Sequence, residues 1–316
     1  KVTRVDVGLA DDLQVVCGAS NVAAGQKVVI ATVNTTVYPV SGEPFKINKS
    51  KIRGEVSEGM ICAEDEIGLG HDHAGIMVLD ADAPVGSAAK EYFKLEDDYM
   101  FEIGLTPNRA DAASHLGVAR DLAAYLKTKV IMPDLSGFKA DSDSLLIPVK
   151  IENPEACGRY SSLTISGVTV TESPDWLKEK LNTIGVRPIN NIVDVTNYVL
   201  HELGQPLHAF DADAIVGQKV LVKKCADGTV FQTLDEVDRK LSSEDLMICN
   251  AESPMCIAGV FGGMSSGVKQ STTRIFLESA WFDAVSVRKT SKRFGLKTDA
   301  SFRFERGTDP DMTVMA

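Results

Sequence analysis

The sequence predicts an α+β protein of more than one domain, with a small β-barrel first and a larger α+β domain after it. At 316 residues the chain is longer than most single cores. Its first 95 residues contain short apolar runs separated by glycine and asparagine, a pattern typical of a small barrel. From about residue 147, helical periodicity alternates with strand-like runs, which indicates a mixed domain.

The expected strands of the first region are short and closely spaced. Some of them alternate between apolar and polar residues, and others are continuous apolar runs. We expect them at residues 2–7, 13–17, 27–33, 59–63 and 75–79. The chain begins inside the first of these runs, which suggests a fragment or a barrel whose opening residues are missing.

The pattern changes between residues 97 and 134. We expect a strand at 100–104, a turn at TPNR, and then a helix at 111–127 with one apolar face. The polar, turn-rich residues 133–143 are interpreted as a linker.

The last region begins with two expected helices. The first has Pro174 at its first position after Ser173, turns Trp176, Leu177, Leu181 and Ile184 inward, and ends at Gly185. The second opens after Asn190 or Asn191, either of which can cap it, and ends at Gly204. Pro206 prevents continuation, so we expect His208 on a short turn that aims its imidazole into a cavity.

Further strands and one more helix complete the prediction. The strands are expected at residues 219–225, 246–249, 256–261 and 274–282. A helix at 283–294 should close with Gly295.

Composition excludes several classes of protein. A net charge of −11 argues against a generally basic nucleic-acid-coating protein, although a local cationic face suffices for RNA binding. No apolar run approaches membrane-spanning length, so no membrane partner is expected. The six scattered cysteines fit reduced thiols in a cytoplasmic protein.

Motifs for covalent, metal or nucleotide chemistry are missing from the sequence. There is no GxSxG, no HExxH and no GxxxxGK[ST] loop. His71, Asp72 and His73 are too close together for an ordinary metal site, and a solvated turn explains them better. We therefore expect no metal and no cofactor in this chain.

Six blocks of sequence resemble those of one enzyme family, in that family's order. They are FKINKSKIRGEVSEGMIC, LTPNRADAASHLGVARDLAA, RPINNIVDVTNYVLHELGQPLHAF, GVFGG, FLESAWFD and GLKTDASFRFERGTDP. In this order they resemble the beta subunit of bacterial phenylalanyl-tRNA synthetase. The resemblance covers nearly the whole chain.

The resemblance implies a domain organisation. Residues 1–95 would be an oligonucleotide-binding (OB) barrel that binds tRNA, with a truncated start. Residues 96–146 would be part of a small accessory domain and a linker, and residues 147–316 a B3/B4-like editing domain.

The resemblance also implies partners. The family's complete enzyme is an α2β2 phenylalanine-tRNA ligase that charges tRNA(Phe), and its ATP and Mg²⁺ bind in the alpha subunit. The editing domain hydrolyses tyrosine wrongly attached to tRNA(Phe).

The family's editing residues fall on six positions of this sequence. The resemblance implies a catalytic role for His208, Glu278 and Thr298, and a substrate-binding role for Arg187, Gly262 and Ala300. His208 would orient a water or the ribose end of the ester, and Glu278 would accept a hydrogen bond from the tyrosine phenol. Without the resemblance, a hydrogen-bonded structural histidine and a solvent-facing strand glutamate are the simpler interpretations.

Two basic groups are candidates for RNA contact. The first consists of Lys46, Lys49, Lys51 and Arg53, which could bind phosphates or form a solvated barrel edge. The second consists of Arg288, Lys289, Lys292, Arg293, Arg303 and Arg306. The alternative to an editing enzyme is a non-catalytic RNA-binding or assembly module with an editing-like scaffold.

Overall fold

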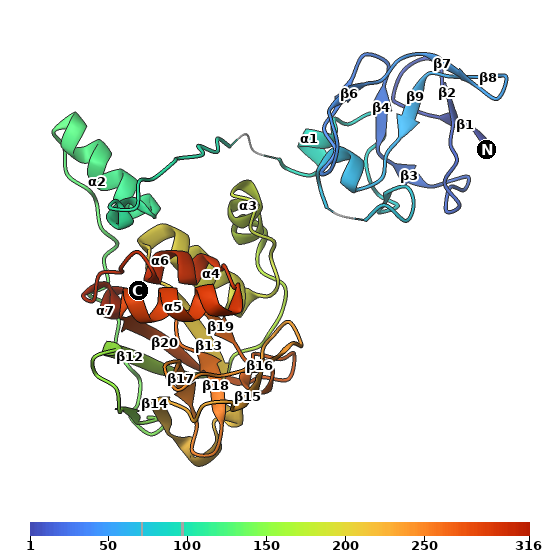
Figure 1. Ribbon diagram of the computed structural model, residues 1–316. Coiled ribbons are helices and arrows are strands. Elements are labelled where there is room, and N and C mark those ends of the chain that lie inside the picture. The colour runs from blue at the N-terminus through green and yellow to red at the C-terminus, as the bar shows by residue number, and fades with distance from the viewer. Residues whose placement is uncertain (71, 96–97) are drawn as a thin grey trace. The chain divides into compact units, whose positions relative to one another are not determined.

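The computed structural model describes residues 1–70, 72–95 and 98–316. Its contacts divide the chain into two compact units, Lys1–Asp98 and Tyr99–Ala316 (Figure 1). The expected class, a β unit followed by a larger α+β unit, is confirmed. In the described residues, no helix is long and apolar enough to cross a membrane.

The N-terminal unit consists of short antiparallel strand pairs. The pairs are β1–β2, β3–β10, β4–β9, β5–β6 and β7–β8, and their hydrogen bonds form no closed barrel among the described residues. The strands are β1 (Val2–Val5), β2 (Leu13–Val16), β3 (Lys27–Val28), β4 (Ile30–Thr32), β5 (Thr36–Val37), β6 (Phe45–Lys46), β7 (Ser50–Ile52), β8 (Glu55–Ser57), β9 (Gly59–Ile61) and β10 (Val78–Leu79). The strand expected at 27–33 is therefore two strands, which pair with different partners.

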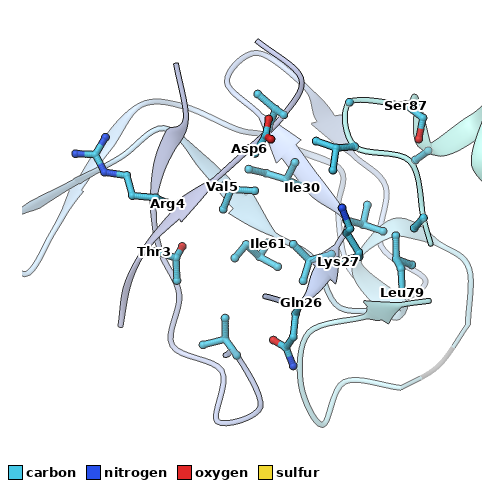
Figure 2. Close-up of a pocket in the computed structure, with 18 of the residues that line it drawn as sticks. Thr3, Arg4, Val5, Asp6, Gln26, Lys27, Ile30, Ile61, Leu79 and Ser87 are labelled. Atoms are coloured by element: carbon cyan, nitrogen blue, oxygen red, sulfur yellow. The ribbon is translucent and has the colours of Figure 1, made fainter. Parts of the chain in front are cut away.

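Apolar side chains gather inside this unit. Val15, Cys17, Val22, Ile61 and Ile76 form one buried cluster. The strands also surround a cavity of about 820 Å³. Figure 2 shows Val5, Ile30, Ile61 and Leu79 among its lining residues. The unit ends with the short helix α1 (Ala89–Tyr92).

Between residues 99 and 146 the chain is largely irregular. The prediction of a strand at 100–104 is wrong, because these residues are exposed coil and pair with no described strand. The expected helix begins later, as α2 (His115–Leu126), because the Ser114 hydroxyl caps it by accepting from the Gly117 N–H. Residues 133–143, which the sequence analysis interprets as a linker, contain no helix or strand.

Two sheets build the rest of the C-terminal unit. A five-stranded sheet has the order β11-β14-β17-β18-β19, and a three-stranded sheet has the order β12-β20-β13. The strands are β11 (Val149–Ile151), β12 (Cys157–Ser166), β13 (Leu207–Asp211), β14 (Val220–Lys224), β17 (Leu246–Cys249), β18 (Pro254–Ile257), β19 (Phe261–Gly262) and β20 (Arg274–Phe282), with β15 (Val230–Gln232) and β16 (Asp238–Lys240) as a separate ribbon. Side chains from both sheets share one core, including Val222, Ile248, Phe276 and Phe282.

Of the four strands predicted for this region, one differs in the structure, and five strands (β11, β12, β13, β15 and β16) were not predicted. The strand expected at 256–261 turns back on itself at residues 258–260, where Gly259 has a φ of +67°. A side chain is strained at such a φ, so glycine permits the turn. The result is two antiparallel strands, β18 and β19, and β19 lies at the edge of the sheet.

The three predicted helices of this region end close to the expected residues, and two further short helices, the last two named here, were not predicted. The helices are α3 (Asp175–Thr183), α4 (Asn191–Leu203), α5 (Ala284–Phe294), α6 (Asp299–Phe304) and α7 (Met312–Met315). Asn190 caps α4, and Asp283 caps α5. Two details of the prediction for α3 are wrong. Pro174 is the cap residue rather than the first helical residue, and Trp176 is 55% exposed, with its ring edge against Tyr198.

Candidate functional site

The candidate site lies on the three-stranded sheet, on the face that β20 turns toward the core. Side chains alternate between the two faces of a strand, so Phe276, Glu278 and Ala280 share a face. Phe276 and Ala280 belong to the shared core, and Glu278 is only 6% exposed. Glu278 is thus a carboxylate placed among apolar side chains.

His208 lies in a strand and not on the turn predicted for it. Gly204, Gln205 and Pro206 separate α4 from β13, and the chain then pairs with β20. The register makes His208 and Glu278 direct cross-strand partners. Such partners lie on the same face, with Cβ atoms about 4.5–5.5 Å apart.

Glu278 is held by a tyrosine of the neighbouring strand. The Tyr160 hydroxyl donates a hydrogen bond to Glu278 Oε2 over 2.5 Å. Burial raises the pKa of Glu278 to about 7, against the opposing effect of this hydrogen bond. At neutral pH the carboxyl group therefore exists in both charge states.

His208 is neutral at neutral pH. Burial lowers its pKa to about 4, because the imidazolium loses its hydration. Its ring packs edge-on against Phe210, with 4.4 Å between ring centroids. Neither ring nitrogen has a hydrogen-bond partner among the described residues, so both can bind a water or a substrate group.

Gly262 packs against the imidazole. A Cβ added to Gly262 would lie 3.0 Å from His208 Cε1 and 2.9 Å from Leu234 Cδ1. Real Cβ atoms essentially never come within 3.0 Å of another heavy atom, so any side chain at this position would push the histidine or the leucine aside. The edge strand β19 thus fixes the space beside His208.

Thr298 and Ala300 lie at the start of α6. The Thr298 oxygen accepts from the Ser301 N–H over 3.0 Å, and its hydroxyl donates to the Val260 carbonyl over 3.1 Å. Thr298 therefore ties α6 to the residue that precedes β19. Ala300 packs on the shared core.

Arg187 lies elsewhere on the surface. It is exposed in the loop between α3 and α4. Among the described residues its side chain makes no hydrogen bond or ion pair. The structure thus brings His208, Glu278 and Gly262 together and gives no contact between them and Arg187.

The first cationic group is exposed on the N-terminal unit. Lys46 lies on β6, Lys51 on β7, and Arg53 in the two-residue turn between β7 and β8. Arg53 and Gly54 both have positive φ, as such hairpin turns require. Lys49 is paired with Glu58 at 2.6 Å, which leaves Lys46, Lys51 and Arg53 available to a polyanion.

The second basic group is not one cationic surface. Arg303 is buried and donates to the Ala113 carbonyl and the Asp299 carbonyl. Arg293 forms an ion pair with the buried Asp245. Arg306 stacks on the Phe302 ring at 3.7 Å. Arg288, Lys289 and Lys292 remain exposed along α5.

Metal ligands are not grouped in the described part of the chain. Nowhere there do three His, Cys, Asp or Glu side chains come together in a way that could hold a metal ion. His71, the first residue of the His-Asp-His triplet, lies outside the described residues. His73 contacts Asp65 at 3.0 Å.

Comparison with known families matches both halves of the chain. The model of the family described as "B3/4 domain" matches residues 156–316, a range that contains all six residues of the candidate site and also Tyr160. The chain belongs to the B3/4 domain family. A second model, described as "Putative tRNA binding domain", matches residues 1–88.

Curated relatives confirm the resemblance found in the sequence. A phenylalanine–tRNA ligase beta subunit from Bacteroides thetaiotaomicron is 58% identical over 99% of this chain and 39% of its own length. Those of Porphyromonas gingivalis and Salinibacter ruber are 57% and 49% identical, again over 39% of their lengths. The chain thus spans about two fifths of the relatives that it matches.

A solved structure is also similar in part. It is an N-terminal fragment of the phenylalanyl-tRNA synthetase beta subunit from Pyrococcus horikoshii. The identity is 15%, the TM-score is 0.34, and 60% of each chain is covered.

The B3/4 region contains a site residue that the sequence did not suggest. Tyr160 lies on β12, a strand that was not predicted, although its residues YSSLTIS are rich in strand formers. Only the pairing of β12 with β20 brings the Tyr160 hydroxyl to Glu278.

Proposed function

We propose that this chain is the tRNA-binding and editing part of a bacterial phenylalanine–tRNA ligase beta subunit, and that its B3/4 domain hydrolyses tyrosyl-tRNA(Phe). One observation carries the proposal: His208 and Glu278, distant in sequence, are direct cross-strand partners. The relatives' name and the tRNA-binding family match support the wider assignment.

The reaction needs an oriented water and no covalent intermediate. The water oxygen bonds to the ester carbonyl carbon, the bond from that carbon to the ribose oxygen breaks, and the ribose oxygen takes up a proton. A neutral imidazole can accept a hydrogen bond from the attacking water at one nitrogen. His208 has the required charge state, since its pKa of about 4 keeps it neutral near pH 7.

Glu278 supplies the choice between tyrosine and phenylalanine. A synthetic pocket shaped for phenylalanine rejects an added hydroxyl only weakly, so a second site is needed. Glu278 can accept the phenol hydrogen of tyrosine. A phenylalanyl ester offers no such hydrogen and would cover the carboxylate without satisfying it, which costs free energy.

The remaining residues shape the site. Gly262 leaves space beside His208, and Thr298 secures the chain just before β19. Ala300 contributes to the packing around α6. Arg187, which is exposed on its loop, is proposed to meet the tRNA end when it binds.

The wider assembly follows from the same proposal. The complete enzyme would be an α2β2 tetramer that attaches phenylalanine to tRNA(Phe) in the cytoplasm. Its ATP and Mg²⁺ would bind in the alpha subunit. In the N-terminal unit, Lys46, Lys51 and Arg53 would contact tRNA phosphates.

Deacylation of tyrosyl-tRNA(Phe) tests the proposal. The assembled ligase should release tyrosine from it much faster than phenylalanine from phenylalanyl-tRNA(Phe). A ligase that charges tRNA normally and clears neither ester would instead support the alternative, a B3/4 region that serves only in assembly or RNA binding.

A further inference from the structure

Among the residues that the structure describes, only one oxygen of the Glu278 carboxylate accepts a hydrogen bond. Oε2 accepts the hydrogen bond from Tyr160, over 2.5 Å. Among the described residues, no donor reaches Oε1. A carboxylate can accept hydrogen bonds at both oxygens, so this one retains an open position for a second hydroxyl.

Strand register explains why Tyr160 reaches this oxygen. Tyr160 pairs with Ala280, and Glu278 stands two residues further along β20. Diagonal cross-strand neighbours are about 7–8 Å apart, a distance that a long aromatic side chain spans. The Tyr160 ring packs on the shared core, which limits the positions open to its hydroxyl.

We propose that Tyr160 is a positioning residue for tyrosine recognition. Its hydroxyl holds Glu278 Oε2, so that Oε1 is presented to the phenol of the tyrosyl ester. This inference rests on the proposed editing function. In it, the carboxylate would receive two phenol hydrogen bonds, one from the protein and one from the substrate.

Tyr160 also favours the charged form of Glu278. A hydrogen bond donated to a carboxylate stabilises the ionised state and lowers its pKa. Tyr160 itself stays protonated, because burial and the Glu278 charge raise its pKa well above the usual value. Tyr160 thus opposes the effect of burial and keeps part of the Glu278 population ionised at neutral pH.

The other titratable groups around Glu278 carry no charge at neutral pH. His208 on β13 is neutral. Burial, followed by the Glu278 charge, raises the pKa of Cys157 on β12 to about 12 and raises that of Cys256 on β18. Among the described residues, Tyr160 is therefore the group whose hydrogen bond lowers the pKa of Glu278 and so opposes the effect of burial.

The test is Tyr160→Phe, which removes one oxygen and keeps the ring. Two quantities are measured in the assembled ligase. The first is the ratio of tyrosyl- to phenylalanyl-tRNA deacylation as a function of pH, and the second is the titration of the Glu278 carboxyl by carbon-13 NMR, assigned with Glu278→Gln. Tyr198→Phe, on α4, is the matched control.

In the unmodified protein, selectivity for tyrosine should rise with pH through about 7, as Glu278 ionises. In Tyr160→Phe the midpoint of both curves should move upward by about one to two pH units, with roughly tenfold or more loss of selectivity at pH 7. Raising the pH should recover part of the loss. A purely structural role would lower activity without moving either midpoint.

A second measurement covers the case in which Tyr160→Phe does not fold. Replacing the protein's tyrosines with 3-fluorotyrosine makes the phenol a stronger donor, so the Glu278 midpoint should move downward. An unchanged midpoint, with tyrosyl-tRNA still cleaved, would overturn the role of Tyr160 alone. Lack of cleavage by the unmodified ligase would overturn the editing function and this inference with it.

Discussion

His208 and Glu278 face each other across the β13–β20 ladder, 70 residues apart in sequence and direct partners in register. The two side chains differ in their hydrogen-bond partners. Glu278 is buried and is hydrogen-bonded to Tyr160, whereas the nitrogens of His208 have no described partner. One side chain is held by a hydrogen bond and the other has open hydrogen-bonding positions, and the roles we propose for them, recognition of the substrate by Glu278 and orientation of water by His208, depend on this difference.

His208→Ala should slow deacylation of tyrosyl-tRNA(Phe) and leave phenylalanine charging unchanged. A positioned acid or base contributes about 10²–10⁴-fold to a rate, so a loss of at least 100-fold is expected. Single-turnover deacylation measures the loss, and aminoacylation is the control. Because His208 packs against Phe210, a thermal melt should accompany the assay. Equal losses in both activities would point to damaged structure.

Glu278→Ala should lower the selectivity for tyrosyl over phenylalanyl esters more than it lowers the rate of tyrosyl-tRNA(Phe) deacylation. A hydrogen bond to a charged group contributes about 1.5–3 kcal/mol, which corresponds to roughly ten- to a hundredfold in selectivity. The ratio of tyrosyl to phenylalanyl deacylation rates measures it. Selectivity equal to that of the unmodified protein would remove Glu278 from tyrosine recognition.

The parts of the fold that the sequence predicts well are those with local causes. The ends of α4 depend on Asn190 and Gly204, and those of α5 on Asp283 and Gly295, so caps visible in the sequence place both helices. The strand expected at 100–104 fails because its apolar residues find no partner strand among the described residues, and pairing is not a local property.

The site shows the same limit. The resemblance implies that His208 and Glu278 are editing-site residues, and that role stays a prediction. Their pairing depends on the register between β13 and β20, which the sequence does not reveal. His208 was expected on a turn because Pro206 ends α4, yet the chain becomes a strand at once because β20 offers an edge. Tyr160 was missed for a related reason: its role exists only through β12 pairing.

Gly262→Ala should impair editing by moving His208. The added methyl would lie 3.0 Å from His208 Cε1 and 2.9 Å from Leu234 Cδ1, so the imidazole and the leucine must give by a few tenths of an ångström. Because a displacement of about 1 Å at a catalytic group can cost about 100-fold in rate, this smaller shift should lower the rate by less than 100-fold. Gly267→Ala is the matched control, since its Cβ would meet Leu234 Cδ2 at an ordinary 3.4 Å. Equal deacylation rates in the two variants would contradict a steric role for Gly262.

Neutralising Lys46, Lys51 and Arg53 should weaken tRNA binding and flatten its dependence on salt. Each lost phosphate contact should reduce the slope of log affinity against log salt by about 0.7–0.9. Lys49→Gln should have a smaller effect, because Lys49 is already paired with Glu58. Lys139→Gln, in the exposed 133–143 segment, controls for net charge. An unchanged slope in the triple variant would show that these cations form only a solvated edge of the N-terminal unit and do not contact tRNA.

Cys225 should be the thiol that reacts first with alkylating agents. Its Sγ lies 3.9 Å from that of Cys249, and the hydrogen bond from Cys249 is the largest cause that lowers the pKa of Cys225 to about 7. Burial raises the pKa of Cys157 to about 12 and that of Cys62 to about 11. The thiolate is the reactive species, so the lowered pKa of Cys225 makes it more reactive near neutral pH than Cys157 and Cys62, whose raised pKa values keep them protonated. Mass spectrometry after brief iodoacetamide treatment should find Cys225 modified first, with a rate that rises through pH 7. Cys249→Ala removes the hydrogen-bond donor beside Cys225 and should move that midpoint upward, whereas Cys256→Ala should leave it in place. Modification of Cys157 or Cys62 before Cys225 would show that the thiol pair does not activate Cys225.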